Sequence, residues 1–295
     1  MRNQGFFQGR WWPLLLSAPQ LLLVFLFFYW PTLVAFQWSF FLERPFGGGS
    51  VFVGLANFER LFADAEFYRA AGRSVLFMLT ASVASVVLAF VLAAAADRRL
   101  RITPIARNLL FWPKAVAGAA TGVMLTYLFN PITGVLSWLN ALSPGLWNPT
   151  LDGLDATILL NLAYIWGNIP FNFVILLAGL QALPDTYHQA AAVDGAGPWR
   201  RLWDMQLPLL TPQIFLCLVL EFNESFTGAF ALIESMTKGG PGGATTHLVY
   251  KIYSDGFKGY DLSGSSTQSL VLMALIAAIT LIQFLALERR VHYER

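Results

Sequence analysis

The residues best suited to binding a solute or an ion are polar side chains inside long apolar segments. They are Lys114, Asn168, Asn172, Glu221, Asn223 and Glu224. Glu221 and Glu224 are three residues apart, so in a helix they share one face, with Asn223 beside them. Asn168 and Asn172, four residues apart, form a similar polar face on another segment. Polar groups are costly in hydrocarbon and usually face a protein interior or an aqueous pathway, so these carboxylates and amides are the predicted lining of a substrate pathway.

The depth and the sign of these charges limit what they can bind. Counting about 1.5 Å per residue from the cytoplasmic helix ends puts Lys114 roughly 10 Å deep and both carboxylates roughly 21 to 25 Å deep. A direct pair between Lys114 and either carboxylate is therefore not expected. Two carboxylates on a pathway would repel a phosphate dianion, which favours a neutral polyol or sugar. A structural alternative stays open, because an acidic residue can also cap a neighbouring helix or pair with another subunit.

Motifs of known catalytic sites are missing from the sequence. It contains no Gly-x-x-x-x-Gly-Lys phosphate loop, no His-Glu-x-x-His zinc motif and no Gly-x-Ser-x-Gly nucleophile elbow. The histidines His188, His247 and His292 fall in three separate connections or tails, so they do not form one metal site. We therefore expect a chain without catalytic residues, without a metal or cofactor, and without an ATPase site of its own.

The composition is that of a membrane protein, with 56% hydrophobic and 12% charged residues. A helix needs about 20 apolar residues to cross the hydrocarbon core. Six segments qualify, near Leu14–Phe36, Val75–Ala96, Asn108–Phe129, Ala156–Leu183, Leu207–Ile233 and Ser269–Leu287. Prolines inside several of them predict kinks rather than ends. The expected fold is an all-α integral membrane protein of about six transmembrane helices, with residues 1–295 in a single transmembrane domain.

Positive charge in the connections orients the chain, because Lys and Arg resist translocation. The cytoplasmic side is assigned Arg2, Arg10, Arg98, Arg99, Arg101, Arg107, Arg200, Arg201, Arg289, Arg290 and Arg295. The outer side is assigned the smaller set Arg44, Arg60, Arg69, Arg73, Lys238, Lys251 and Lys258. The connection 130–155 has no Lys or Arg and agrees with an outer location. Both termini are therefore predicted to be cytoplasmic, as is the connection 184–206.

That cytoplasmic connection contains a short polar stretch, Tyr187–Arg201, followed by Leu207-Pro208. Its Ala-rich start favours a helix, and Asp194-Gly195 is a typical helix stop. Nothing in it can do chemistry. We expect a docking element for another subunit, with an ordinary helix–loop–helix connection as the alternative.

The sequence resembles a known family at these residues. Gln189-Ala190-Ala191-x-x-Asp194-Gly195-Ala196 with a distal Leu-Pro is similar to the coupling motif, Glu-Ala-Ala-x-x-x-Gly, in permease subunits of binding-protein-dependent ABC importers. The carbohydrate-type permeases, and among them most of all the glycerol-3-phosphate permease subunits, share further stretches. These are Trp12-Pro13-Leu14-Leu15, Ala18-Pro19-Gln20, Trp30-Pro31, Phe52-Val53-Gly54-Leu55-x-Asn57-Phe58, Lys238-Gly239-Gly240-Pro241, Thr245-Thr246, Tyr250-Lys251-Ile252-Tyr253 and Asp255-Gly256-Phe257.

The resemblance implies a function and partners. Gln189, Ala190, Ala191, Asp194, Gly195 and Ala196 would form a coupling helix seated on a separate ATP-binding subunit, which holds the ATP and Mg²⁺. A second permease subunit, an ATPase dimer and an extracytoplasmic solute-binding protein would complete an importer in the bacterial inner membrane, with no nucleic acid. The cargo would be a sugar, a polyol or a glycerol-phosphate-type solute. Gln189 replaces the family's Glu, which exchanges an ionic contact for a neutral hydrogen bond about half as strong.

A rival class is an ion-coupled secondary transporter or channel in which Glu221 and Glu224 bind protons or cations. Internal inverted repeats are typical of many such proteins, and no clear repeat is visible between the two halves. The docking stretch would also have no purpose in that class.

Overall fold

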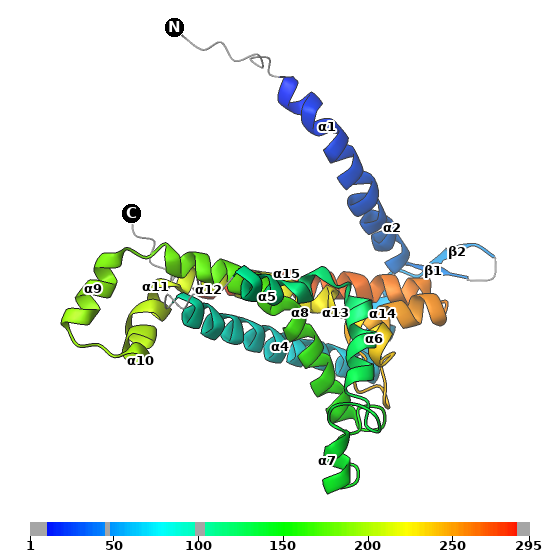
Figure 1. Ribbon diagram of the computed structural model, residues 1–295. Coiled ribbons are helices and arrows are strands. Elements are labelled where there is room, and N and C mark those ends of the chain that lie inside the picture. Colours follow the sequence, from blue (N-terminus) through cyan, green and yellow to red (C-terminus); the bar gives the residue numbers. More distant parts are fainter. Residues whose placement is uncertain (1–10, 45–47, 98–103, 288–295) are drawn as a thin grey trace. The chain divides into compact units, whose positions relative to one another are not determined.

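The computed structural model describes residues 11–44, 48–97 and 104–287, most of them in helices (Figure 1). The chain divides into two compact units, one made of residues up to Asp64 with Ile252–Met273 and the other of Ala65–Lys251 with residues from Ala274 onward. Several residues used for the topology lie outside the described part of the chain, as does His292. They are Arg2, Arg10, Arg98, Arg99, Arg101, Arg289, Arg290 and Arg295. The backbone of Arg107 is described, but its side chain is not.

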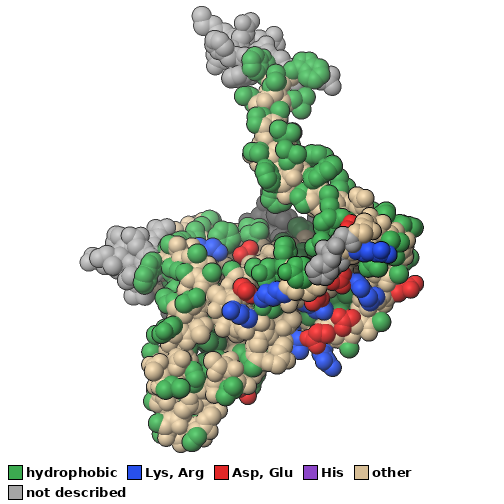
Figure 2. Space-filling view, turned by 90° about the vertical axis from the view of Figure 1, so that its right-hand side faces the viewer, with side chains coloured by type: hydrophobic (Ala, Val, Ile, Leu, Met, Phe, Trp, Pro, Cys, Tyr) green, Lys and Arg blue, Asp and Glu red, His purple; other side chains and the backbone are tan. Residues whose placement is uncertain are grey.

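The first unit begins with a 28-residue apolar span made of α1 (Trp12–Val24), the π-helical turn η1 (Phe25–Tyr29) and α2 (Trp30–Ser39). The π turn precedes Pro31, which has no N–H for the carbonyl four residues earlier, so local widening absorbs the disruption. No residue of α1 or η1 is buried. Figure 2 shows hydrophobic side chains along this rod, a surface that suits lipid or another apolar helix.

Short elements follow the span. Strands β1 (Phe41–Glu43) and β2 (Ser50–Phe52) form an antiparallel hairpin in which Phe41 pairs with Phe52. Helix α3 (Ala56–Ala63) comes next. The buried amide of Asn57 donates to the carbonyls of Ser39 at 2.9 Å and Phe41 at 3.0 Å, so α3 is tied to the end of α2.

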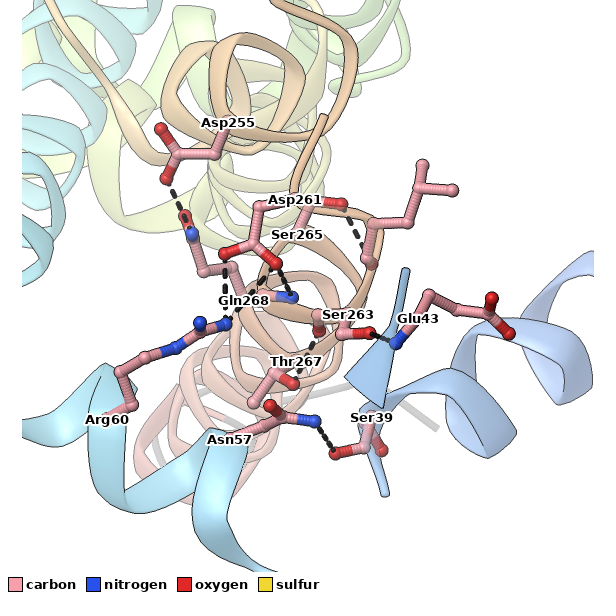
Figure 3. Close-up of polar contacts among 12 residues, drawn as sticks. Ser39, Glu43, Asn57, Arg60, Asp255, Asp261, Ser263, Ser265, Thr267 and Gln268 are labelled. Atoms are coloured by element: carbon pink, nitrogen blue, oxygen red, sulfur yellow. Dashed lines mark hydrogen bonds and ion pairs between the residues drawn. The ribbon is translucent and has the colours of Figure 1, made fainter. Parts of the chain in front are cut away.

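Polar contacts join this hairpin and α3 to the start of α15 (Leu262–Leu287) within the first unit (Figure 3). Ser263 Oγ accepts from the backbone N–H of Glu43 at 2.8 Å. Asp261 accepts from Arg60 at 2.9 Å and from the N–H of Gly264 at 2.8 Å. Because Arg60 and Asp261 are both partly exposed, this ion pair contributes under about 1 kcal/mol. Hydrogen bonds therefore tie the hairpin, α3 and the start of α15 together within this unit.

The second unit is built around α4 (Ala65–Asp97) and α8 (Gly153–Gln181), which pack against each other. Ala70, Ala81, Ala89 and Ala93 of α4 are fully buried, and such small residues let membrane helices approach closely. Helix α8 starts at Asp152, whose carboxylate accepts from the N–H of Leu154 at 2.7 Å. These two long helices provide the frame for the polar residues described below.

The third expected span, 108–129, is not a single helix. Helix α5 (Pro104–Ala115) ends near Pro113, and α6 (Gly118–Leu128) starts after Ala117, whose backbone is extended at φ −61° and ψ 141°. A side chain at Gly122 would overlap Ser235, so this glycine lets α6 pack closely on α13 (Ala229–Met236). The break redirects the chain just after Lys114.

The fifth expected span, 207–233, is also interrupted. Helix α12 (Thr211–Thr227) is bent by 69° relative to Pro198–Leu209, the segment that ends in α11 (Leu207–Leu209). Leu210 lies at the bend and is fully buried. A Cβ at Gly179 of α8 would lie 2.7 Å from the Leu210 side chain, so the bend and α8 are in close contact.

Two further short helices are α7 (Ser137–Leu142) and α14 (Leu248–Tyr253), and the π turn η3 (Ser254–Lys258) follows α14. Within the described residues, four helices are long and apolar enough to cross a membrane, or five if the bent pair is one span. The prediction of an all-α membrane protein of about six spans is confirmed, while the third span is broken. Cytoplasmic termini stay a prediction.

Candidate solute pathway and coupling loop

The polar residues predicted inside the membrane separate into a buried network and a cavity wall, both in the second unit. Asn172 and Glu221 form the network. Lys114, Asn168 and Glu224 belong to the wall. The two carboxylates of α12 are therefore in different surroundings, although they are less than one turn apart.

The buried network is centred on Glu221, a residue that is 3% exposed. Asn172 Nδ2 donates to Glu221 Oε1 at 2.7 Å and to Ser85 Oγ of α4 at 3.0 Å. The hydroxyls of Ser82 and Tyr164 donate to the Glu221 backbone carbonyl at 3.2 and 3.3 Å. These contacts link α4, α8 and α12. A core position of this kind indicates a structural role for Glu221 and Asn172.

The cavity wall surrounds a volume of about 220 Å³. Lys114 Nζ donates to Asn168 Oδ1 at 2.9 Å, and Asn168 Nδ2 donates to the Tyr164 carbonyl at 3.2 Å. Glu224 lines the same cavity, beside Gly228, where a side chain would overlap the Glu224 carboxylate. The wall therefore carries one cation, one carboxylate, an amide and hydroxyls among small residues.

The depth count from the sequence assumes that the helix containing Lys114 is straight. It places Lys114 more than 10 Å from the level of Glu224 on straight helices, whereas both residues line one cavity. The break between α5 and α6 removes the straight-helix geometry on which that count depends. The expected absence of a direct pair agrees with the contact of Lys114, which is to the amide of Asn168.

Asn223 is the predicted pathway residue that points elsewhere. Its amide donates to the Val219 carbonyl at 2.8 Å and to Thr280 of α15 at 3.5 Å. Among the described residues that line the cavity, neither Asn223 nor the Asn172–Glu221 pair appears. The sequence pattern therefore placed Glu221, Asn223 and Glu224 on one polar face of α12, whereas in the structure only Glu224 lines the cavity. It also missed Tyr164, Ser82 and Ser85, whose signal is a hydroxyl inside an apolar helix.

The predicted coupling loop, residues 184–206, contains a regular helix with a defined end. Helix α9 (Asp185–Val193) stops at Asp194, and Gly195 has φ +67°. The N–H of Gly195 donates to Ala192 O at 3.2 Å, and that of Ala196 donates to Ala191 O at 2.9 Å. This is the Schellman pattern, in which a residue with positive φ satisfies the last helix carbonyls. Gln189, Ala190 and Asp194 are exposed on the helix surface.

The rest of the loop returns to the unit through α10 (Pro198–Arg201) and the π turn η2 (Leu202–Gln206). Arg201 Nε donates to Ala196 O at 2.7 Å, and Leu202 is buried in the core. Val193, Trp199 and Trp203 are 88%, 74% and 60% exposed. Large apolar side chains left in the open on a polar loop are typical of a protein–protein contact.

The connection formed by residues 237–247 is attached to α4. Ser74 Oγ accepts from the N–H of Leu248 at 2.8 Å. The His247 ring lies 4.7 Å from the Phe77 ring and is 3% exposed. Burial, with a smaller contribution from the Arg73 charge, lowers the pKa of His247 to about 4. His247 is therefore a neutral, structural histidine at ordinary pH.

Metal binding has no support in the described ranges 11–44, 48–97 and 104–287. No three or more His, Cys, Asp or Glu side chains gather there in a way that could hold a metal ion.

Comparison with known proteins defines the class. Residues 74–293 match the family of binding-protein-dependent transport system inner membrane components, and the chain belongs to this family. It is 41% identical over 287 residues to the sn-glycerol-3-phosphate transport system permease protein UgpA of Rhizobium meliloti strain 1021, covering 97% of this chain and 98% of that protein. The protein of the same name from Yersinia enterocolitica is 43% identical over 290 residues, covering 98% of each.

Solved structures share the fold. A bacterial ABC transporter involved in the import of the acidic polysaccharide alginate matches with a TM-score of 0.81 at 20% identity, covering 95% of this chain and 96% of that one. The alginate transporter in complex with its alginate-bound periplasmic protein matches with a TM-score of 0.78 at 18% identity, covering 93% of each chain. The family match over residues 74–293 makes the chain a transport component of the inner membrane.

Proposed function

We propose that this chain is the permease subunit of an ATP-driven importer for a glycerol-phosphate-type solute. The observation that supports this proposal most strongly is the sequence identity of 41% and 43%, along almost the whole length, with permease proteins of sn-glycerol-3-phosphate transport systems. A related sugar or polyol remains within the same solute class. The chain forms half of a translocation pathway, and a second permease subunit supplies the other half.

ATP hydrolysis belongs to a partner in this proposal. An ATP-binding subunit dimer carries the ATP and Mg²⁺, and an extracytoplasmic solute-binding protein delivers the cargo. The chain itself has no ATPase site and needs no cofactor. Both termini and the loop 184–206 lie in the cytoplasm, which gives α9 access to the ATP-binding subunit.

The coupling loop transmits the motion of the ATP-binding subunit. Gln189, Ala190 and Asp194 are exposed, and the side chains of Val193 and Trp199 add exposed apolar area for docking. The Schellman end at Gly195 and the hydrogen bond from Arg201 to the Ala196 carbonyl fix the conformation of the loop. The buried side chain of Leu202 attaches the loop to the helix core.

The cavity with Lys114, Asn168 and Glu224 is the section of the solute pathway in this chain. Glu221 and Asn172 hold α4, α8 and α12 together behind it. The match to a binding-protein-dependent transport family supports this function over the alternative of an ion-coupled transporter using Glu221 and Glu224.

Gly195→Val tests the coupling role. A β-branched residue strongly disfavours positive φ, whereas Asn tolerates it, so Gly195→Asn is the matched control. The complex with its ATP-binding subunit and binding protein is reconstituted in lipid discs, and ATP hydrolysis is measured with and without cargo. We expect cargo stimulation to be lost in Gly195→Val and kept in Gly195→Asn, with both complexes assembled. An assembled Gly195→Val complex with full stimulation would contradict coupling through this loop.

A further inference from the structure

We propose that the cavity beside Lys114 binds the phosphate group of a small polyol phosphate, with Lys114 as the group that contacts it. This inference rests on the proposed importer function and adds a phosphate-recognising site in the membrane domain itself. The class of ligand is a phosphate monoester that carries free hydroxyls.

The surroundings of Lys114 support this role. Within the described chain Lys114 donates one hydrogen bond, and its acceptor is the neutral amide oxygen of Asn168 at 2.9 Å. An ammonium group has three N–H donors, and the Lys114 side chain is exposed to the cavity. A cation whose hydrogen bond goes to a neutral amide attracts an anion more strongly than one neutralised by a carboxylate.

The position of the carboxylates removes the main electrostatic objection to a phosphate. On the sequence alone, Glu221 and Glu224 together would repel a dianion. In the structure Glu221 is in the buried network, so Glu224 is the carboxylate that lines this cavity with Lys114. The wall then has no excess of negative charge. Glu224 and Asn168 can accept hydrogen bonds from hydroxyl groups while Lys114 binds the phosphate.

The size of the cavity suits a small ligand. Its volume of about 220 Å³ is below the usual range of roughly 300 to 1,000 Å³ for drug-sized ligands. Gly167, Gly228 and Ala163 line it, so little side-chain volume fills the space. A three-carbon polyol phosphate matches this size better than an oligosaccharide.

The test is a binding measurement. The permease–ATPase complex is placed in lipid discs without binding protein, and direct binding of radiolabelled glycerol 3-phosphate is measured. Loss of one charge-assisted contact predicts about tenfold weaker binding for Lys114→Met. Lys114→Arg keeps the positive charge and should bind within a few-fold of the native complex. Lys258→Met, which removes a lysine from the outer turn η3, is the matched control and should bind as the native complex does.

Two neighbours of Lys114 give changes of opposite sign. Asn168→Asp places a carboxylate against Lys114 and should weaken binding about tenfold. Glu224→Gln removes the negative charge of the wall and should tighten it a few-fold. A purely structural role for these residues would lower assembly in both variants and would not produce tighter binding. If Lys114→Met fails to assemble, the Glu224→Gln result therefore still decides the proposal.

Competition separates the sources of the phosphate. Inorganic phosphate should compete with glycerol 3-phosphate, while glycerol should compete poorly. Replacing phosphatidylcholine discs by phosphatidylglycerol discs should leave the affinity unchanged, whereas strong competition by the anionic lipid would show a lipid headgroup site and overturn the proposal. Unchanged affinity in Lys114→Met would overturn it as well, as would the absence of binding to a native complex that still performs ATP-driven uptake. If the native complex shows no ATP-driven uptake at all, the importer function itself would be refuted.

Discussion

Glu221 and Glu224 belong to the same helix, yet their side chains differ in burial and in hydrogen-bond partners. Glu221 is buried and receives a hydrogen bond from Asn172 at 2.7 Å, whereas Glu224 is exposed along a cavity wall with Lys114. On an α-helix two residues three apart are separated by about 60° around the axis. At the edge of a packed core that angle is enough to divide a structural group from a solvent-facing one.

The largest expected effect comes from removing the hydrogen-bond donor of the buried carboxylate. Asn172→Leu leaves the buried Glu221 side chain without its amide partner and should cost about 3 kcal/mol of stability, because an unsatisfied buried polar group is expensive. Thermal unfolding of the complex in lipid discs measures the loss. Asn223→Leu is the control, since that amide makes a 3.5 Å contact to Thr280, and it should cost clearly less. Equal losses would remove the special status of the Glu221 network.

His247 extends the contrast to a buried group outside the spans. Its pKa in the folded protein is lowered to about 4 from 6.5, so the unfolded chain takes up the proton first as the pH falls. Stability from this group is complete above pH 6.5 and is lost towards pH 4, by up to about 3 kcal/mol. Melting temperatures between pH 7.5 and pH 4.5 should fall less steeply in His247→Gln. A variant with the native slope would show that another group titrates.

Gly179 tests whether the bend and α8 are as close as the buried core suggests. A Cβ there would meet the Leu210 side chain at 2.7 Å, so Gly179→Ala should destabilise the complex by about 1 to 3 kcal/mol. Gly72→Ala is the matched control, because a Cβ at Gly72 has open space. Thermal unfolding of both variants compares them directly, and a neutral Gly179→Ala would indicate a looser contact.

The smallest effect on stability is expected at the cavity wall. Glu224→Ala removes an exposed carboxylate and should change stability by less than about 0.5 kcal/mol. The same variant should alter cargo-stimulated ATP hydrolysis. Destabilisation as large as that of Asn172→Leu would mean that Glu224 and Glu221 serve one structural network.

The elements that the sequence predicted well are those with a local signal. The membrane spans follow from apolar length, and the stop at Gly195 follows from its Asp-Gly pair, because positive φ favours glycine. The orientation of Asn223 towards Thr280 depends on the packing of α15 against α12. A local sequence pattern does not predict that packing.

The break after Lys114 was also beyond local reasoning. Proline inside a membrane helix can either kink or end it, and packing of neighbouring helices decides between the two. In this chain Gly122 fits closely against Ser235, so α6 is placed by its contact with α13. The placement of Lys114 and Glu224 on one cavity follows from that packing.

The contact at Gly179 has a thermodynamic consequence for the whole helix. Helix α8 is 29 residues long and carries Asn168 and Asn172, and near its end Gly179 touches the bend that leads to the coupling loop. Coupling free energies between two sites are reciprocal. Whatever the docking of the ATP-binding subunit does to the affinity of the cavity, an occupied cavity must do to the affinity for that subunit. With the cavity assigned to the solute as proposed, binding of the cargo would also change the affinity for the ATP-binding subunit.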